Sequence, residues 1–430
     1  MKKILLINPY IYDFAAYDFW VKPLGLLYLS SALKANGYSV TLIDCLDRSG
    51  YITDNFYRTK NNHSGKYKKI KVDIPEPLKF MERNFFRYGI PLDEFADRLK
   101  DTPKPDAICI TCVMTYWYYG AAQTIKFIKN IFPDIPVILG GIYATLFENH
   151  AKLNSGADFI ITGPAESKLP ELLAELLHTQ TFSPKTNCIE KNLPDYSLYD
   201  RLFSAAVMTS RGCGYSCSYC ASKFLFNNFI QFDIDVCANF IESLVIEREV
   251  NDIAFYDDAL LKNSAIHFIP FLKKIISKNL KCRFHLPNAI HIKLITDEIA
   301  ELMFNAKFDT VRLGFESNDF SWLEGNSPKF DKNDFENCIR ILNKAGIKNY
   351  AAYLLTGLPD KNNFETDSAA AYLESLGVKT DYAYFSPLPH TGYWKKSVAA
   401  FPQIENEPLL TNCSVFPVLS GSFKNRRKKI

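Results

Sequence analysis

The chain has 430 residues, which predicts two or three domains. Hydrophobic residues make up 47% and charged residues 23%, as in folded globular proteins, and a net charge of +3 excludes a strongly charged surface for nucleic acid or an anionic membrane. The sequence contains no apolar stretch long enough for a membrane span or a signal peptide, and eleven cysteines without a secretion signal favour reduced thiols, so we expect a cytoplasmic protein.

The first 177 residues alternate between short apolar strands and amphipathic helices. Strands separated by helices form parallel sheets with right-handed crossovers, so we predict an α/β, Rossmann-like domain over residues 1–177. Residues 46–100 break the alternation with a polar, lysine-rich and aromatic segment, which we interpret as an insertion that covers part of the domain. The predicted strands are Ile4–Asn8, Ser39–Asp44, Asp106–Thr111, Pro136–Leu139 and Asp158–Thr162, and the predicted helices are Leu24–Asn36, Ala121–Ile131 and Leu169–Leu177.

A polar stretch with two prolines separates this domain from a second series of alternating elements. We place a linker at residues 178–203, a second domain at 204–390 and a C-terminal extension at 391–430. Six strand–helix repeats predict a partial (β/α)6-type barrel, whose functional residues gather at the carboxyl ends of the strands. The predicted strands lie near Ala205–Thr209, Asp252–Tyr256, Lys281–His285, Thr310–Leu313, Asn349–Leu355 and Asp381–Phe385, and the helices near Ala238–Glu249, Ile266–Lys278, Asp297–Asn305, Asp331–Ala345 and Phe364–Leu376.

Three closely spaced cysteines follow the first strand of the second domain. Cys213, Cys217 and Cys220 stand four and three residues apart, so their thiolates can converge on one iron–sulfur core. Three protein ligands for a [4Fe-4S] cluster leave one iron open to a further molecule. The alternatives are a cluster that only transfers electrons and a structural zinc site, although zinc needs a fourth ligand that no cysteine or histidine nearby in the sequence supplies.

The cysteine loop resembles that of the radical S-adenosylmethionine superfamily, Cys-x-x-x-Cys-x-aromatic-Cys, with Tyr219 in the aromatic position. The resemblance extends over residues 205–390. It implies that the open iron binds the amino and carboxylate groups of S-adenosylmethionine, and that an electron entering the sulfonium breaks the C5′–S bond. The resulting 5′-deoxyadenosyl radical abstracts hydrogen from a substrate, while the protein positions the reactants and keeps water out. An external one-electron reductant such as flavodoxin or ferredoxin is also implied.

Polar residues and a glycine follow the later barrel strands, in the order in which this superfamily places its contacts with S-adenosylmethionine. The implied contacts are Asp257 with Asp258 for the methionine amino group, Asn288 for the ribose, Glu316 for the ribose or carboxylate region, and Gly357 for the adenine. Each position also has a purely structural interpretation, as a carboxylate pair at a helix N-terminus for the two aspartates and as loop packing for the others. We interpret His285, His291 and His390 as core or loop residues in preference to acid–base groups.

Glycines end two strands of the first domain, at Gly140-Gly141 and at Gly163, and predict a crevice over the parallel sheet. This pattern resembles the cobalamin-binding domain fused to many radical S-adenosylmethionine enzymes, and implies that these glycines line a cobalamin site. The sequence lacks the Asp-x-His-x-x-Gly loop that supplies a histidine to cobalt, and His63 has the wrong spacing, which excludes that ligation but not cobalamin. Four consecutive aromatic residues, Tyr116 to Tyr119, either stack on a corrin or fill its space, in which case the domain is degenerate.

These patterns support three hypotheses. The first is cobalamin-dependent methyl transfer to an unreactive carbon or phosphorus centre of a small-molecule or peptide substrate. The second keeps the radical chemistry for a rearrangement, cyclisation or ring modification, and the third is a metal-binding scaffold without catalysis. We do not expect a nucleic-acid substrate, because only about forty residues follow residue 390 and they leave no room for an RNA-binding domain. The sequence identifies no catalytic side chain beyond the cofactor contacts.

Overall fold

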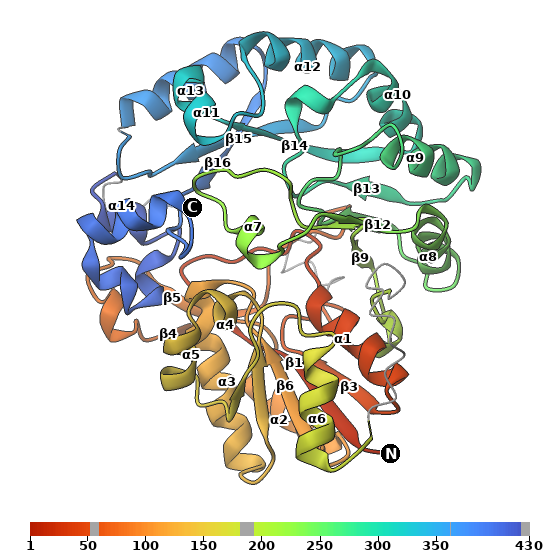
Figure 1. Cartoon of the computed structure of the whole chain (residues 1–430), viewed down its shortest axis with the longest axis vertical. Coiled ribbons are helices and arrows are strands. Elements are labelled where there is room, and N and C mark those ends of the chain that lie inside the picture. The colour runs from red at the N-terminus through yellow and green to blue at the C-terminus, as the bar shows by residue number, and fades with distance from the viewer. Residues whose placement is uncertain (52–59, 181–192, 362, 423–430) are drawn as a thin grey trace.

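The structure, a computed structural model, describes residues 1–51, 60–180, 193–361 and 363–422. A parallel sheet dominates each half of the chain, and the two halves lie one below the other in Figure 1. The N-terminal sheet has five strands in the order β3-β1-β6-β7-β8, all parallel. This doubly wound order places the topological switch point between β1 and β6 and confirms the predicted Rossmann-like fold.

The strands of this sheet are short and apolar because helices cover both faces. They are β1 (Lys3–Asn8), β3 (Ser39–Asp44), β6 (Ala107–Thr111), β7 (Val137–Gly140) and β8 (Phe159–Ile160), and the helices are α1 (Leu24–Ala35), α2 (Leu92–Asp101), α3 (Tyr118–Ile131), α4 (Ile142–Leu146), α5 (Glu148–Asn154) and α6 (Lys168–Leu177). Two elements differ from the prediction by more than one residue at a boundary. β8 is shorter, because the Asp158 side chain accepts a hydrogen bond from the backbone of Val137 at the start of the strand. α3 begins three residues early, because the aromatic residues before it are helical rather than looped.

The second half is an open barrel of six parallel strands that pair in chain order, as predicted. Its strands form the arc in the upper part of Figure 1, with helices on the outside. The strands are β9 (Ser204–Val207), β12 (Asp252–Phe255), β13 (Arg283–His285), β14 (Phe308–Glu316), β15 (Tyr350–Thr356) and β16 (Lys379–Tyr384), and the helices are α8 (Ile234–Ile246), α9 (Phe268–Ser277), α10 (Asp297–Asn305), α11 (Phe320–Asn326), α12 (Lys332–Lys344) and α13 (Asn363–Ser375).

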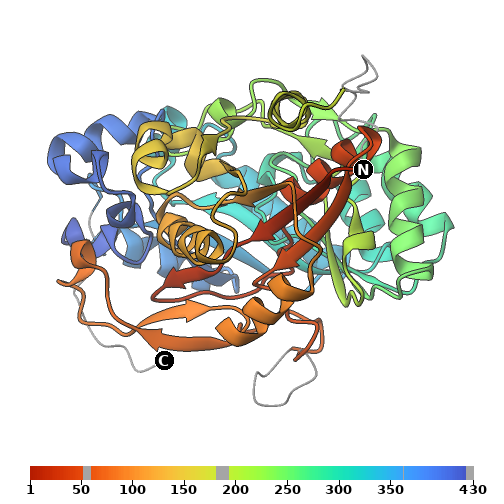
Figure 2. The ribbon, with the colours of Figure 1, turned by 90° about the horizontal axis from the view of Figure 1, so that it is seen from below.

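The segment interpreted as an insertion forms a small antiparallel sheet. Its strands β4 (Lys69–Val72) and β5 (Phe85–Tyr88) pair with each other, and β5 also pairs with β2 (Ile11–Asp13). Figure 2 shows this sheet, in orange, along one side of the N-terminal domain. The segment therefore covers the domain, and its last residues begin α2, which is one of the crossover helices rather than an addition to the fold.

The C-terminal residues pack back onto the N-terminal domain. Short helices α14 (Gly392–Ala400) and α15 (Phe416–Leu419), with a 3-10 turn at Pro408–Thr411 between them, contribute to the same hydrophobic core as β1, β6 and α3. The Thr115 and Thr411 hydroxyls lie 3.1 Å apart, and the Asn412 amide donates to Asp13 over 3.0 Å. Both halves of the molecule thus share one core at this point. No helix among the described residues is long and apolar enough to cross a bilayer.

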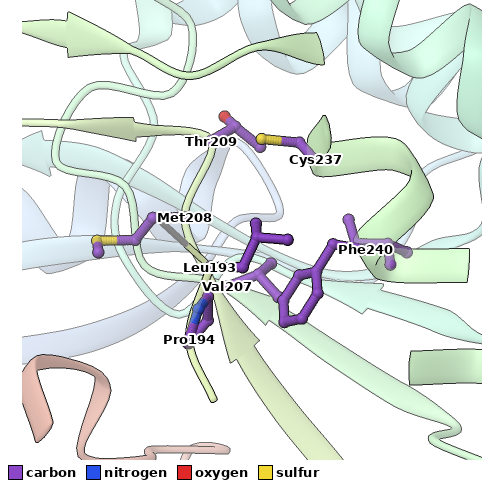
Figure 3. A pocket seen from close by; sticks show the side chains of 8 residues that line it. Leu193, Pro194, Val207, Met208, Thr209, Cys237 and Phe240 are labelled. Carbon is purple, nitrogen blue, oxygen red and sulfur yellow. The ribbon is translucent and has the colours of Figure 1, made fainter. Parts of the chain in front are cut away.

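Residues 193–195 of the linker, just before the barrel, are hydrogen-bonded to helix α1. The Ser31 hydroxyl donates to the backbone of Leu193, and the Ser30 hydroxyl donates to Asp195 over 2.6 Å. The side chains of Leu193, Val207 and Phe240 converge on a narrow apolar hollow between the linker, β9 and α8 (Figure 3). This hollow lies where the linker packs on the barrel, and residues 181–192, just under half of the predicted linker, lie outside the described residues.

Candidate functional site

The three predicted cluster ligands lie on one loop at the carboxyl end of β9. The loop starts from a two-residue strand, β10 (Ser210–Arg211), which pairs with β11 (Ile230–Gln231), and it ends in the short helix α7 (Ser222–Leu225). Gly212 has a φ of +82°, and a side chain at this position would meet the carbonyl oxygen of Asn228 at 2.4 Å. A glycine is therefore required for the loop to turn immediately before Cys213.

The three cysteines of the loop differ in exposure. Cys217 is buried, Cys213 is half-buried and Cys220 is exposed, and all three are free thiols. Burial raises the pKa of the Cys213 thiol. Within the described ranges no group of three His, Cys, Asp or Glu side chains is positioned to hold a single metal ion.

The segment after α11 packs directly against this loop. The backbone N–H of Ser218 donates to the Asn326 carbonyl over 2.9 Å, and the Tyr219 hydroxyl donates to Ser327 over 3.1 Å. The Ser327 hydroxyl also lies 3.4 Å from the Cys217 sulfur, and Lys329, two residues farther on, lies 4.0 Å from Glu316. The sequence analysis did not identify Ser327 or Lys329, because Ser327 lies 110 residues from Cys217 in the sequence and only the fold brings this segment to the cysteine loop.

Glu316 and Tyr219 lie together beside the cysteine loop, as the resemblance implied for a shared cofactor site. The Tyr219 hydroxyl lies near the Glu316 carboxyl, and Glu316 Oε1 lies 4.0 Å from the Lys329 ammonium. Burial raises the pKa of the Glu316 carboxyl, while the Lys329 charge and the Tyr219 hydroxyl oppose the rise. Glu316 has a φ of +63°, at a register shift near the end of β14. A left-handed conformation is uncommon for glutamate and indicates that the carboxyl is held in place by its surroundings.

The two aspartates after β12 have different surroundings. Asp257 is fully buried and accepts hydrogen bonds from the backbone and hydroxyl of Thr209 and from the Ser210 hydroxyl, at 2.6–3.2 Å. Burial raises its pKa to about 6. Asp258 instead accepts from Ser222, whose hydroxyl lies 3.4 Å from the Cys220 sulfur. Asp257 therefore fixes the start of the cysteine loop, and Asp258 contacts Cys220 through Ser222.

The alternative interpretation of this pair as helix N-terminal carboxylates is wrong, because α9 begins only at Phe268.

Asn288 and Gly357 both contact other parts of the protein. The Asn288 amide donates to the carbonyls of Tyr256 and Asp257, so it closes the end of β12. A side chain on Gly357, whose φ is +83°, would meet the Pro417 ring at 2.8 Å. The missing side chain at Gly357 thus makes room for α15, and the free space expected there for adenine is taken up by Pro417.

The strand-end glycines of the N-terminal domain are partly exposed but not equivalent. A side chain on Gly141 would meet Cys112 and Thr111 within 3 Å, so this glycine is needed for packing against β6. At Gly163, whose φ is +69°, the nearest atom to such a side chain is the Lys168 ammonium at 3.7 Å, and at Gly25 nothing lies within 4 Å. Open space therefore lies on the α1 and α6 side of the sheet.

A buried ion pair joins this edge to the cysteine loop. Arg211 Nη1 lies 2.5 Å from Glu166 Oε1, and these side chains are only 8% and 12% exposed. The Arg211 guanidinium also lies over the Tyr28 ring of α1. Glu166 follows Gly163 by three residues and Arg211 precedes Cys213 by two, so the pair holds the two predicted cofactor loops against each other. The other carboxylate oxygen, Glu166 Oε2, is buried without a hydrogen-bond partner, which fits a ligand that carries amide donors.

The four aromatic residues after β6 pack against other parts of the protein and are not exposed for stacking on a corrin. Trp117 donates to the buried Asp13 over 2.8 Å, Tyr118 donates to Glu407 over 2.9 Å, and the Tyr116 hydroxyl lies 3.5 Å from the Cys413 sulfur. The partners come from the first loop and the C-terminal segment. These aromatic residues therefore pack within the protein, beside the switch point between β1 and β6.

The stack of Tyr118 and Tyr143 encloses His150 and gives the chain a pH-dependent element. Burial lowers the pKa of His150 to about 4, and its Nδ1 lies 2.7 Å from the Tyr143 hydroxyl. Histidine titrates near 6.5 in unfolded chains, so between about pH 6.5 and pH 4 the unfolded state binds the extra proton. We expect the thermal midpoint of the cluster-free protein to fall over this interval, and to fall less in His150→Gln. Parallel profiles of the two proteins would contradict this assignment.

The three histidines of the barrel region are structural, as interpreted. His285 is fully buried, stacks on Trp20 at 3.9 Å and contacts Asp252 over 2.8 Å. His291 stacks on Tyr215 of the cysteine loop, and burial lowers its pKa to about 3, while His390 stacks on Phe224. Asp252 also contacts His63 over 2.5 Å, so the insertion reaches into the barrel at this point.

Two family models match the chain. The B12 binding domain matches residues 81–173, beginning inside the segment interpreted as an insertion, and the radical SAM superfamily matches residues 207–373. An "Uncharacterized methyltransferase PH0819" from Pyrococcus horikoshii is 24% identical over 71% of this chain and 72% of its own length. An "Anaerobic magnesium-protoporphyrin IX monomethyl ester cyclase" from Rubrivivax gelatinosus is 21% identical over 69% of this chain, which spans only 59% of that protein.

The same fold occurs in a solved structure. The radical S-adenosylmethionine methyltransferase TsrM from Kitasatospora setae, solved with its tryptophan substrate and aza-SAM, superposes with a TM-score of 0.68. The match covers 93% of this chain and 76% of TsrM, at 16% sequence identity. At that identity the likeness establishes the order and packing of both domains, and the site residues have to be argued from this chain.

Proposed function

Because the chain is a radical S-adenosylmethionine enzyme with an N-terminal cobalamin-binding-like domain, we propose that it methylates an unactivated carbon or phosphorus centre with the help of both cofactors. Cys213, Cys217 and Cys220 hold a [4Fe-4S] cluster, and the edge around Gly140 and Gly163 holds cobalamin. The substrate is a small molecule or peptide, an external one-electron reductant such as flavodoxin or ferredoxin supplies electrons, and the enzyme works in the cytoplasm.

The observation that carries this proposal is the Arg211–Glu166 ion pair. It is buried, it belongs to neither half alone, and it fixes the cysteine loop of the barrel against the glycine edge of the other domain. Two cofactors that exchange a group with one substrate must be held at a constant separation, and a buried charge pair between their loops provides this, because breaking it leaves an unpaired charge.

The cluster site is built by side chains with separate tasks. The three thiols provide the ligands, Asp257 anchors the loop that carries them, and Ser222 and Ser327 contact two of the sulfurs. When bound, such a cluster supplies one electron to S-adenosylmethionine and an open iron to orient it. Tyr219 and Glu316 lie beside the ligands and present a polar surface to the methionine and ribose portions. Asp258, directed toward Ser222 rather than into β9, is the better candidate of the two aspartates for the amino group.

The cobalamin site fits on the α1 and α6 side of the sheet. Gly25 and Gly163 leave space there, and Glu166 Oε2 is an unpaired acceptor for one of the amide side chains of a corrin. When bound, cobalamin supplies a metal that accepts and delivers a methyl group. The protein's part would be to fix its orientation and to keep water away.

The second candidate function is radical cyclisation or rearrangement without methyl transfer. It is favoured by the aromatic residues after β6, whose polar atoms are hydrogen-bonded within the protein. In that case the N-terminal domain serves substrate binding.

Product analysis separates the two functions. The full-length protein would be reconstituted anaerobically with iron, sulfide and cobalamin, then reduced with dithionite in the presence of S-adenosylmethionine. Methyl transfer should yield S-adenosylhomocysteine alongside 5′-deoxyadenosine, and a corrin absorbance that stays with the protein on gel filtration. If 5′-deoxyadenosine forms alone and no corrin is retained at full iron loading, the methyltransferase proposal is wrong and the second function stands. Absence of both products would favour the scaffold hypothesis.

A further inference from the structure

Helix α7, which begins two residues after Cys220, lies on the surface of the molecule. None of its residues is buried, and Figure 1 shows it near the centre of the view, between the two halves. Lys223 is exposed, and Phe224 is 43% exposed although its ring stacks on His390 at 3.7 Å. Cys220 is also the exposed one of the three predicted ligands. The cysteine loop therefore reaches the molecular surface at this end.

Two lysine side chains lie against the stretch of the loop between its first two cysteines. The Lys223 ammonium donates to the Ser216 hydroxyl over 3.0 Å. The Lys262 ammonium lies so close to Gly214 that a side chain at this glycine would collide with it. Gly214 and Ser216 are themselves exposed. Two separate segments of the chain, α7 and the segment after β12, thus bring positive charge to the same exposed part of the loop.

These two positive charges are not neutralised by ion pairs. In the part of the chain that the structure describes, neither Lys223 nor Lys262 forms an ion pair with a carboxylate, and Lys262 lies over an aromatic ring instead. Two carboxylates near the loop have other partners, because Asp258 accepts a hydrogen bond from the first residue of α7 and Glu166 is paired with Arg211. The surface beside the cysteine loop therefore has an excess of positive charge.

We propose that the surface formed by Lys223, Phe224 and Lys262, here called the α7 surface, is the docking site of the external reductant, and that this reductant is an acidic electron-carrier protein of the flavodoxin or ferredoxin kind. The inference rests on the proposed function, since it presupposes a cluster on the three cysteines. In the step concerned, one electron passes from the carrier to the cluster. The carrier is oxidised by one electron, the cluster is reduced by one, and no bond is made or broken.

The position and the chemistry of the α7 surface both fit such a partner. Electron transfer slows steeply with distance, so a carrier is expected to bind where the ligand loop reaches the surface. Negative charge on the carrier complements the two lysines and accelerates its encounter with them, while Phe224 provides an aromatic contact of the kind that interfaces favour at their centre. Complexes of electron carriers are small and transient, so a few residues are sufficient.

The test compares two ways of reducing the reconstituted full-length protein. Dithionite needs no docking surface, whereas a flavodoxin and a ferredoxin, both strongly acidic and kept reduced by their reductase and NADPH, do. In the double variant Lys223→Glu, Lys262→Glu, the carrier concentration for half-maximal 5′-deoxyadenosine formation should rise at least about tenfold at low salt. The rate with dithionite should stay unchanged. Isothermal titration calorimetry should show the same loss of carrier affinity without any turnover.

The matched control is the double variant Lys126→Glu, Lys348→Glu, which changes the net charge by the same amount. Both lysines are exposed and form no ion pair with a described carboxylate. Lys126 lies on α3, and Lys348 precedes β15 at the opposite end of the barrel strands from the cysteine loop. This variant should behave like the wild type with either reductant. In the wild type, added salt should weaken carrier binding, because it screens charges at a surface.

The outcomes separate this inference from the proposed function. If the wild-type protein takes up no four-iron cluster, the proposed function fails and the inference fails with it. If the wild type cleaves S-adenosylmethionine with dithionite, but both double variants bind and use the carriers equally well, the inference fails alone. Loss of the dithionite-driven reaction at full iron loading would place the two lysines in the cofactor site and would also overturn it. Should Lys223→Glu, Lys262→Glu lose the cluster, the wild-type salt series decides, and carrier binding that is independent of salt would refute the inference.

Discussion

Replacement of any one of Cys213, Cys217 and Cys220 by alanine should abolish both the visible absorbance of the cluster and the formation of 5′-deoxyadenosine. A cluster with two protein ligands has no further thiolate within the loop to replace the third, so we expect the loss to be complete rather than partial. The Cys220 variant is the most informative, because Cys220 is exposed and its removal leaves no cavity. Iron and sulfide content, absorbance spectra and product chromatography would be measured on the reconstituted variants.

The matched control is Cys282→Ala. Cys282 is buried in the barrel core, and burial raises its pKa to about 12, so it is an unreactive thiol. This variant should retain the cluster and cleave S-adenosylmethionine like the wild type, with some loss of stability. Full cleavage by any of the three loop variants would show that the ligands have been assigned incorrectly.

Asp252→Ala should destabilise the protein by about 3–5 kcal/mol, the usual cost of leaving a buried charge unpaired. Asp252 is fully buried and contacts the Arg283 guanidinium at 2.8 and 2.9 Å, as well as His63 and His285. Burial alone would raise the pKa of Asp252, but hydrogen bonds from the two histidines and the arginine hold it well below its usual value. Urea denaturation of the cluster-free protein, followed by circular dichroism, would give the difference in unfolding free energy.

The pH dependence of this contribution has a definite sign. A carboxyl whose pKa is depressed in the folded state stabilises the protein above its unfolded pKa of about 3.9. The contribution should be fully present above about pH 4 and disappear as the pH falls through the depressed folded-state value. Asp381→Ala is the control, because its ion pair with Arg312 is 26% exposed on the aspartate side, and such pairs contribute up to about 1 kcal/mol. Equal losses of unfolding free energy in the two variants would show that the buried contacts of Asp252 contribute no more than an exposed ion pair.

Both folds and the cluster loop could be predicted because their signals are local. Alternating apolar strands and helices predict a parallel sheet, and one-handed crossovers leave only a few possible topologies. The cysteines lie within eight residues, and the turn that presents them needs only Gly212. Asp258 and Glu316 were placed near the cluster for the same reason, because strand ends of a barrel converge whatever the intervening sequence.

The remaining site residues could not be predicted because their roles depend on distant partners. Gly357 was expected to admit a ligand, but Pro417, sixty residues away, lies against it. Arg211 and Glu166 look like ordinary loop charges until the two domains meet. The aromatic residues Tyr116 to Tyr119 were predicted as a loop, and the structure shows a 3-10 turn running into a helix, because their polar atoms bond to Asp13 and to the C-terminal segment.

The shared core of the chain's two ends has a consequence for biosynthesis. The Thr115 and Thr411 hydroxyls are in contact although these residues are 296 positions apart in the sequence. Asp13 and Asn412 are hydrogen-bonded although they are 399 positions apart. As the polypeptide leaves the ribosome, the first sheet can assemble early, yet its apolar upper surface stays uncovered until residues 407–416 are made. The nascent chain thus exposes an apolar, aggregation-prone surface while the barrel is being synthesised. A host that expresses this protein well is expected to need a chaperone for that interval, and a stop codon shortly after position 400 should send the product into inclusion bodies.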